Sequence, residues 1–443
     1  MERTLIKDVK NKIGEEVKLA GWVDVRRDHG KLVFIDLRDA SGKVQTVVGP
    51  AHEKAHQAAG VIRSEWVIEV TGKANKRPEK MINQDEENGD VEVEVIDIKI
   101  LSEAEVPFEK EAETNLDTYL DNLPLTLRTE KSKAIFKVQA EIISVFRNFL
   151  SQEGFVEIQA PKIIGEDAEG GANSFNVDYF GYAAHLAQSP QFYKQIMVGV
   201  FEKVFTTGNV YRAEKHSTTR HLNEYTSLDL EIGFIKDHTD VMKIQTKLLA
   251  FIMNQLKEKR QREFALLKAE IPEVPAEILS CKLREAQKII KKEFGQDCTG
   301  APDLDPQHEK WLCQYSKKEY NSDFIFITHF PMEKRPMYTH EDESDPGYAK
   351  GFDLLFRGVE ITTGGQRIHD YNKLVAAIKK KGLNPDKFSF YLQAFKYGMP
   401  PHGGLGMGLE RLTARLLGLD NIKEATLFPR DLNRIDTLLS KNE

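Results

Sequence analysis

The chain has 443 residues, of which 62 are Lys or Arg and 69 are Asp or Glu, and the resulting net charge of −7 excludes binding to polyanions through bulk charge alone. Its 40% hydrophobic and 30% charged residues can bury a large core, and its length predicts two or three domains. Three cysteines without a CxxC pair argue against a disulfide framework or a structural zinc site. The absence of a signal peptide and of an apolar run of about 18 residues predicts a cytoplasmic protein without membrane contact.

Residues 1–104 are predicted to form a small β-barrel. Five segments enriched in β-branched residues show partial period-2 alternation, and turn signals such as Asp28-His29-Gly30 and Asn88-Gly89-Asp90 separate them. A short helical stretch over 52–65 lies between the third and the fourth segment. This order is typical of the OB fold, and a five-strand barrel that binds no ligand is the alternative.

The segment 105–130 carries many charges, two prolines and little periodicity, which predicts a hinge between domains. From Lys131, apolar residues at i, i+3 and i+4 spacing predict a long helix that ends near Gly154. A strand that contains Pro161 is expected to follow this helix.

The remainder of the second domain, 131–443, is predicted to mix strands and helices. A helical, charge-rich insertion is expected over about 238–322, with no role assigned to it, and the last helix over about 406–418. Because strands are grouped with few strand–helix–strand crossovers, we expect an antiparallel sheet flanked by helices. The predicted fold class is therefore α+β, with an N-terminal OB barrel.

Several common catalytic motifs are missing from the sequence. It contains no GxxxxGK[ST] phosphate loop, no GxSxG elbow and no His/Cys cluster with the spacing of metal ligands. Three other segments combine residue types that suit phosphate chemistry.

The first segment reads as strand, loop and strand, with arginines at both ends of the turn. Arg212 precedes the loop and Arg220 closes it. An Arg held on a sheet can make bidentate bonds to a phosphate, which Lys cannot. Surface pairing of these arginines with Glu214 and Glu224 is the alternative.

The second segment contains two carboxylates, Asp353 and Glu360, that lie seven residues apart. On one regular strand this odd offset would put them on opposite faces. They can converge only if Gly358 sits at a turn or bulge, or if they lie on adjacent strands. Two hard oxygen ligands near a triphosphate would suit magnesium, and two unrelated carboxylates are the alternative.

The third segment is the glycine-rich stretch 403–408, which leads into Arg411. Glycines let the backbone approach a flat ligand closely, and Arg411 is expected in the first turns of the following helix, near its positive end. A tight turn that only packs the helix on the sheet is the alternative.

Together and in this order, these segments resemble class II aminoacyl-tRNA synthetases over essentially the whole chain. The helix and strand up to Pro161 resemble the first class II motif, a dimer-interface element; the hairpin 211–224 resembles the second motif, and residues 406–412 the third. An anticodon-binding barrel before such a core is the arrangement of the subclass that serves aspartate, asparagine and lysine.

The amino-acid segments are similar to those of aspartyl-tRNA synthetases, in particular the short archaeal-type enzymes. These segments are 169–171, 188–194 and 364–367. Lys194 and Arg367 would supply two cations for the side-chain carboxylate of aspartate, which needs such bonds when it is buried. Asparagine would leave Lys194 facing an amide, and the resemblance implies that asparaginyl relatives lack this Lys.

The resemblance implies a role for each matching residue. Aspartate binding is implied for Glu169, Ser189, Gln191, Phe192, Tyr193, Lys194, Arg212, Asp229, Thr363 and Arg367. ATP binding is implied for Arg212, Ala213, Glu214, Arg220, His221, Leu222, Glu360, Gly408, Leu409, Glu410 and Arg411. Coordination of Mg²⁺ is implied for Asp353, Glu360 and Thr363, and contact with the tRNA anticodon for Arg27, Phe34 and Gln45.

Phe34 is expected on the outer face of the barrel, because Val33 and Ile35 would otherwise both point outward. There its ring can stack on a base, which contributes roughly 1–3 kcal/mol. His29 and Pro78 lie in loops where they resemble residues of relaxed enzymes that charge both the aspartate and the asparagine tRNA. We therefore expect these two positions to bear on tRNA discrimination.

The predicted activity is the ATP-dependent activation of L-aspartate to aspartyl-adenylate and its transfer to the 3′-hydroxyl of a tRNA. The expected partners are tRNA, aspartate, ATP with Mg²⁺, and a second copy of the chain. Three alternatives stay open: an asparaginyl-tRNA synthetase, an asparagine synthetase built on the same core, and a non-catalytic RNA-binding paralogue.

Overall fold

The computed structural model describes residues 1–84, 88–166 and 173–441, and the chain divides into two compact units, Met1–Ala112 and Glu113–Glu443. The first unit is a closed five-stranded barrel with strand order β1-β2-β3-β5-β4, which confirms the predicted OB fold. A helix, α1, lies between β3 and β4. The bounds are β1 (Glu16–Asp28), β2 (Val33–Arg38), β3 (Lys43–Val48), α1 (Glu53–Val61), β4 (Val67–Lys76) and β5 (Val91–Ser102).

The segment predicted as a hinge, 105–130, is not wholly irregular. It contains two short helices, α2 (Leu116–Asp121) and α3 (Leu123–Thr126). The Asn115 side chain caps α2 by accepting a hydrogen bond from the Thr118 N–H. Pro124, which suggested a linker, lies in the first turn of α3, where a proline costs no helical hydrogen bond.

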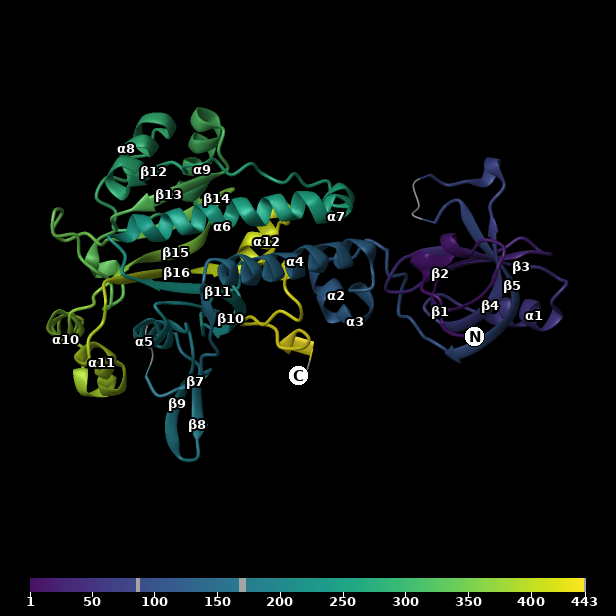
Figure 1. Ribbon diagram of the computed structural model, residues 1–443, viewed down its shortest axis with the longest axis horizontal. Helices are drawn as coiled ribbons and strands as arrows, with labels where there is room; N and C mark the ends of the chain where they lie inside the picture. Colours follow the sequence, from purple (N-terminus) through teal and green to yellow (C-terminus); the bar gives the residue numbers. More distant parts are fainter. Residues whose placement is uncertain (85–87, 167–172, 442–443) are drawn as a thin grey trace. The chain divides into compact units, whose positions relative to one another are not determined.

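The second unit is built on an eight-stranded sheet with order β12-β13-β14-β15-β16-β11-β10-β6 (Figure 1). Neighbouring strands from β13 to β10 pair antiparallel, as predicted, whereas the edge strands β12 and β6 are parallel to their neighbours. The bounds are β6 (Val156–Glu157), β10 (Lys203–Tyr211), β11 (Glu224–Gly233), β12 (Ser280–Lys282), β13 (Phe324–Thr328), β14 (Gly351–Phe356), β15 (Val359–Arg367) and β16 (His402–Gly408).

The single strand expected around Pro161 is in fact two strands in different sheets. The chain leaves the large sheet after β6 and enters a three-stranded sheet of order β7-β9-β8. Pro161 lies in the connection between β6 and β7, since a proline has no N–H to donate to a strand ladder. The bounds are β7 (Ile163–Ile164), β8 (Asn176–Tyr179) and β9 (Tyr182–Leu186).

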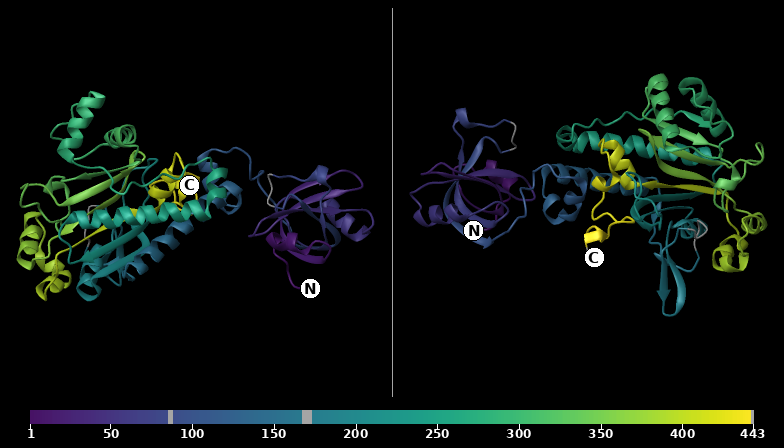
Figure 2. Two further views of the ribbon diagram at one scale, coloured as in Figure 1. Left: turned by 45° about the horizontal axis from the view of Figure 1, so that its top comes forward. Right: turned by 180° about the vertical axis from the view of Figure 1, so that it is seen from behind.

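Helices cover one face of the large sheet. The long helices α4 (Glu130–Gln152) and α6 (His238–Lys259) run side by side (Figures 1 and 2). With α12 (Leu409–Leu416) they pack on a shared hydrophobic core. Leu228 and Leu230 of β11 belong to this core. The alternating side chains of β11 therefore point to the opposite face.

The segment 238–322, predicted as a helical insertion, contributes to the main sheet and to the layers that cover it. Helix α6 packs on β15 and β16, and β12 extends the main sheet. Helices α8 and α9 pack on the opposite face of the sheet from α6, against Ile325, Ile327 and Leu355. The remaining helices are α5 (Gln191–Phe201), α7 (Gln261–Leu266), α8 (Leu283–Phe294), α9 (Pro306–Tyr320), α10 (Tyr371–Lys380) and α11 (Ser389–Lys396).

A search of the described helices finds none with the length and apolar character needed to cross a bilayer.

Candidate active site

A cavity of about 680 Å³ opens on the sheet face that α4 and α6 leave uncovered. Residues from β11, β15 and β16, from the start of α5 and from the segment 333–339 line it. Among the residues that the structure describes, five carboxylates line it: Glu214, Asp229, Glu333, Glu360 and Glu410. They are outnumbered by eight cationic side chains, Lys194, Arg212, Arg220, Lys334, Arg335, Arg367, Lys381 and Arg411. This excess of positive charge suits an anionic ligand.

Helix α5 presents only part of its predicted site segment to the cavity. Gln191 and Lys194 are three residues apart, share one face of the helix and line the cavity. Phe192 faces away and stacks on Tyr391, with ring centroids 4.2 Å apart. Neither Phe192 nor Tyr193 lines the cavity, so the implied role of these two residues in aspartate binding stays a prediction.

The predicted cation pair, Lys194 and Arg367, does line one common cavity. The Lys194 ammonium donates to Asp229 Oδ1 at 2.7 Å and to the Leu405 carbonyl at 3.2 Å. Arg367 Nε donates to Glu231 Oε1 at 2.8 Å, and the other oxygen of Glu231 lies 3.5 Å from Lys194 Nζ. The two cations are thus already balanced by two buried carboxylates.

The sequence analysis did not identify Glu231 as a site residue. Burial alone would raise the pKa of Glu231, but Arg367 and Lys194 together hold it below its ordinary value. Its place two residues after Asp229 on one strand was the available signal, since i and i+2 share a face. Gly404 makes room for it: a Cβ there would lie 2.1 Å from Glu231 Oε2.

Two buried polar atoms beside this cation pair have no hydrogen-bond partner within the described ranges. They are the donor Nε2 of Gln188 and the acceptor Oδ2 of Asp229, and both residues line the cavity. A buried polar atom without a partner costs free energy. A ligand that carries both an acceptor and a donor would satisfy both atoms.

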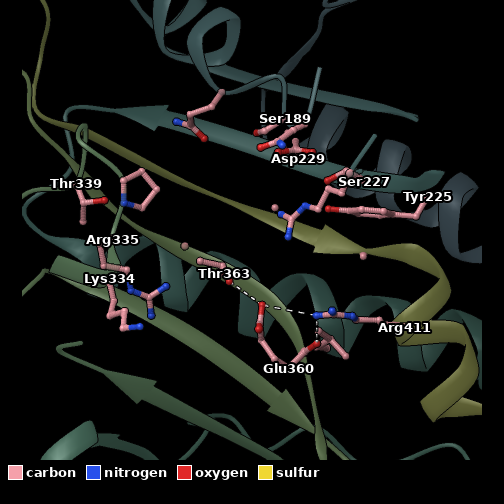
Figure 3. Close-up of a pocket in the computed structure, with 18 of the residues that line it drawn as sticks. Ser189, Tyr225, Ser227, Asp229, Lys334, Arg335, Thr339, Glu360, Thr363 and Arg411 are labelled. Carbon is pink, nitrogen blue, oxygen red and sulfur yellow. Dashed lines mark hydrogen bonds and ion pairs between the residues drawn. The ribbon is translucent and has the colours of Figure 1, made fainter. Parts of the chain in front are cut away.

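Across the cavity from Asp229 and Ser189 lies the group around Glu360 (Figure 3). The Thr363 hydroxyl donates to Glu360 Oε1 at 2.7 Å, and Arg411 donates to the Glu360 carbonyl at 3.0 Å. Arg411 belongs to the first turn of α12, as predicted, although the glycine-rich stretch before it is the strand β16 and not a turn.

The hairpin of β10 and β11 supplies the remaining phosphate candidates. The Arg212 guanidinium lies 5.7 Å from the centroid of the Tyr225 ring. His221 Nε2 lies 3.7 Å from Glu214 Oε2. Burial lowers the pKa of His221, and the charges of Arg411 and Arg220 act in the same direction, against the opposing charge of Glu214. The predicted residues Arg220, Leu222, Gly408 and Glu410 also line the cavity, whereas Ala213 and Leu409 do not.

Glu410 connects two elements of the fold at the edge of the cavity. Its two carboxylate oxygens accept the Thr226 N–H at 3.0 and 3.1 Å, which ties α12 to β11. Burial raises the pKa of Glu410 to about 7.

Asp353 and Glu360 lie on adjacent strands, β14 and β15, joined by a turn in which Arg357 and Gly358 both have positive φ. Asp353 pairs across the ladder with Thr363, which bonds Glu360. Both oxygens of Asp353, however, accept from Arg335, at 3.1 and 2.8 Å. Burial raises the pKa of Asp353 to about 6, and Arg335 opposes this.

The donor set near Glu360 fits a Mg²⁺ ion only in part. The Glu360 carboxylate and the Thr363 hydroxyl are oxygen donors of the kind that Mg²⁺ prefers. Asp353 does not line the cavity, and Arg335 would have to release it first. Within residues 1–84, 88–166 and 173–441, no group of three or more His, Cys, Asp or Glu side chains has a metal-binding arrangement. Arg335 itself carried no motif in the sequence. Glu169 lies outside the described residues.

On the barrel, three predicted residues share the outer face of β1, β2 and β3. Phe34 lies on this face while its neighbours Val33 and Ile35 are buried in the core. Arg27 donates two bonds to Asp36, at 2.7 and 2.8 Å, and one to Gln45 Oε1 at 3.4 Å. The cluster is therefore held in place before any ligand binds.

The two candidates for tRNA discrimination lie in loops of the barrel. The ring of His29 meets Phe34 edge-on, with centroids 5.5 Å apart. Pro78 is exposed and follows β4.

Comparison with protein families supplies the deciding observation. The family of class II tRNA synthetases (D, K and N) matches residues 115–432. The chain belongs to this family. A second family, the OB-fold nucleic acid binding domain, matches residues 17–101. This confirms the resemblance seen in the sequence, and the chain is an aminoacyl-tRNA ligase that uses ATP, an amino acid and a tRNA as substrates.

Individual relatives are similar over nearly their whole length. The chain is 46% identical to the aspartate–tRNA(Asp/Asn) ligase of Deinococcus radiodurans, covering 98% of this chain and 99% of the relative. It is 39% identical to the aspartate–tRNA(Asp) ligase of Pyrococcus furiosus, covering 95% and 96%. A solved structure of asparaginyl-tRNA synthetase from Pyrococcus horikoshii with asparaginyl-adenylate matches with a TM-score of 0.91 at 31% identity, over 98% of this chain and 99% of that one.

Proposed function

We propose that this synthetase joins L-aspartate to tRNA(Asp) and also to tRNA(Asn). The observation that carries the choice of aspartate is the meeting of Lys194 and Arg367 in one cavity with the phosphate-binding candidates Arg212 and Arg411. A buried carboxylate needs charge-assisted bonds, and an amide in the same place would leave a cation poorly solvated. The 46% identity to an aspartate–tRNA(Asp/Asn) ligase supports the same choice.

The substrate aspartate would place its side-chain carboxylate between Lys194 and Arg367. The ammonium of Lys194 has three N–H groups, of which Asp229 and the Leu405 carbonyl accept two. Asp229 Oδ2, which lacks a partner among the described residues, would accept a bond from the α-ammonium group of the substrate. Glu169 would act beside it, as the resemblance to aspartyl-tRNA synthetases implies.

In the first step, the aspartate α-carboxylate attacks the α-phosphorus of ATP in line, and pyrophosphate leaves. Negative charge grows on the phosphoryl oxygens, and Arg212 and Arg411 would neutralise it. Glu360 and Thr363 would hold Mg²⁺, which would add positive charge beside the phosphates. Asp353 would join them only after Arg335 releases it.

In the second step, the terminal 3′-hydroxyl of the tRNA attacks the aspartyl-adenylate and AMP leaves. No protein nucleophile is needed for this transfer. Phe34 would stack on an anticodon base, while Arg27 and Gln45 would contact its neighbours. His29, which packs on Phe34, and Pro78 would relax the discrimination between the two tRNAs.

Pyrophosphate exchange into ATP, measured in parallel with aspartate and asparagine, tests the amino acid. We expect exchange with aspartate, and exchange with asparagine alone would refute the proposal in favour of the asparaginyl enzyme, whose fold is closely similar. Charging of tRNA(Asp) and tRNA(Asn) transcripts then tests the second part, and a failure to charge tRNA(Asn) would remove it.

We also infer a two-fold symmetric homodimer in the cytosol. The resemblance of α4 and the segment up to Pro161 to the first class II motif supports the dimer. Three cysteines that are all free thiols support a reducing compartment. The mass of the particle in solution, measured by light scattering, tests the dimer.

A further inference from the structure

A buried carboxylate from the segment 238–322 contacts two residues that line the cavity. Glu309 lies in the first turn of α9 and is 7% exposed. Its Oε2 atom accepts from the Arg220 guanidinium at 2.6 Å and from the Glu360 N–H at 2.9 Å. One oxygen thus joins the arginine that closes the β10–β11 loop to the backbone of the strand that carries Glu360.

The position of Glu309 is fixed by its surroundings. The Asp305 side chain caps α9 by accepting the N–H groups of Gln307 and His308, both at 2.8 Å. The helix also packs tightly on the β14–β15 turn, since a Cβ at Gly358 would lie 3.0 Å from the side chain of Lys310. A residue held this firmly can set the position of its partners.

The bond to Glu309 determines the position of the Arg220 guanidinium group. Arg220 and Glu360 line the same cavity, and Glu360 already has Arg411 within 3.9 Å. Without Glu309, Arg220 would be drawn toward the carboxylates that remain, Glu360 among them, and would compete with a ligand for them. With Glu309 present, one N–H group of the Arg220 fork is held at the wall and the others can reach a phosphate.

We propose that Glu309 is a positioning residue for the nucleotide and acts through Arg220, while its bond to the Glu360 N–H anchors the carboxylate in place. The proposal rests on the proposed synthetase function and adds to it a residue of α9 that touches neither substrate. Its effect should therefore appear in the use of ATP and not in the use of aspartate.

The test is ATP–pyrophosphate exchange by the full-length enzyme. For Glu309→Ala we expect KM for ATP to rise about tenfold while KM for aspartate stays within about twofold, because one charge-assisted bond to Arg220 is lost. Glu309→Gln keeps both acceptor contacts without the charge, so we expect a rise of about threefold. Glu319→Ala removes an exposed carboxylate of the same helix and should change neither constant.

A double-variant cycle separates positioning from a general structural role. If Glu309 acts through Arg220, Glu309→Ala should change KM for ATP less than about twofold in an Arg220→Ala background. Effects that multiply, or an equal rise in KM for both substrates, would overturn the proposal. If Glu309→Ala does not fold, an unchanged KM for ATP in folded Glu309→Gln would overturn it. A wild-type enzyme without aspartate-dependent exchange would instead refute the proposed function.

Discussion

Replacing Lys194 by Met should separate the two roles of this buried ammonium group. Its side chain is 1% exposed and its charge balances Asp229 at 2.7 Å. Removing one partner of a buried ion pair costs about 3–5 kcal/mol of folding free energy. Losing a charge-assisted bond to the substrate carboxylate costs about a further 1.5–3 kcal/mol of binding, which corresponds to about 10–150-fold in kcat/KM for aspartate.

The double variant Lys194→Met/Asp229→Asn distinguishes the two costs. It removes both charges of the pair and leaves the Arg367–Glu231 bond in place, so we expect the free energy of unfolding to return to within about 1.5 kcal/mol of the wild type. The use of aspartate should stay impaired. Lys243→Met, at an exposed site of α6, is the matched control.

Urea unfolding and ATP–pyrophosphate exchange with aspartate measure the two quantities. A folded Lys194→Met variant that retains kcat/KM for aspartate within about twofold of the wild type would contradict the assignment of Lys194 to the substrate carboxylate. The same would hold if the double variant regained full aspartate activity along with its stability.

Three further outcomes are expected. Glu360→Gln should lower kcat/KM for ATP by about 100-fold and raise the Mg²⁺ concentration needed for half-maximal exchange. Both effects should exceed those of Asp353→Asn, because Arg335 occupies both oxygens of Asp353. A larger effect of Asp353→Asn in a Mg²⁺ titration would contradict this. Phe34→Ala should lower kcat/KM for tRNA charging by about 5–150-fold, the value of one stacked base, and leave ATP–pyrophosphate exchange unchanged, whereas a loss of exchange would indicate a folding defect. Burial lowers the pKa of His402 from 6.5 to about 4, so the unfolded chain binds the proton first as the pH falls. The free energy of unfolding should therefore drop by about 2 kcal/mol between pH 6.5 and pH 5. Urea unfolding of His402→Gln over the same pH range should lack this part of the decline.

Local pattern was sufficient for much of the architecture. The alternation around Phe34 placed its ring outside the barrel, since neighbouring residues of a strand face opposite ways, and the apolar stripe after Lys131 placed α4 to within two residues of its end at Gln152. The same reasoning failed at Pro161, where one predicted strand is shared between two sheets, and it did not foresee that Pro124 of the predicted hinge lies in the first turn of a helix.

The residues of the candidate site also fall into those that the sequence identified and those that it did not. Residue types that carry chemistry, such as Lys194, Arg367 and Arg411, could be selected from the sequence because their roles depend on their own charge and on short segments around them. Their partners could not. Glu231, Arg335 and Glu309 reach the cavity from a strand, a loop and a helix that are remote in the chain, and only the register of the sheet and the packing of α9 bring them within hydrogen-bond distance. The sequence alone therefore determined the charged residues that belong to recognisable motifs. The tertiary structure decided which further charges join them and which of them neutralise one another, because electrostatic pairing depends on distances across the fold and not along the chain.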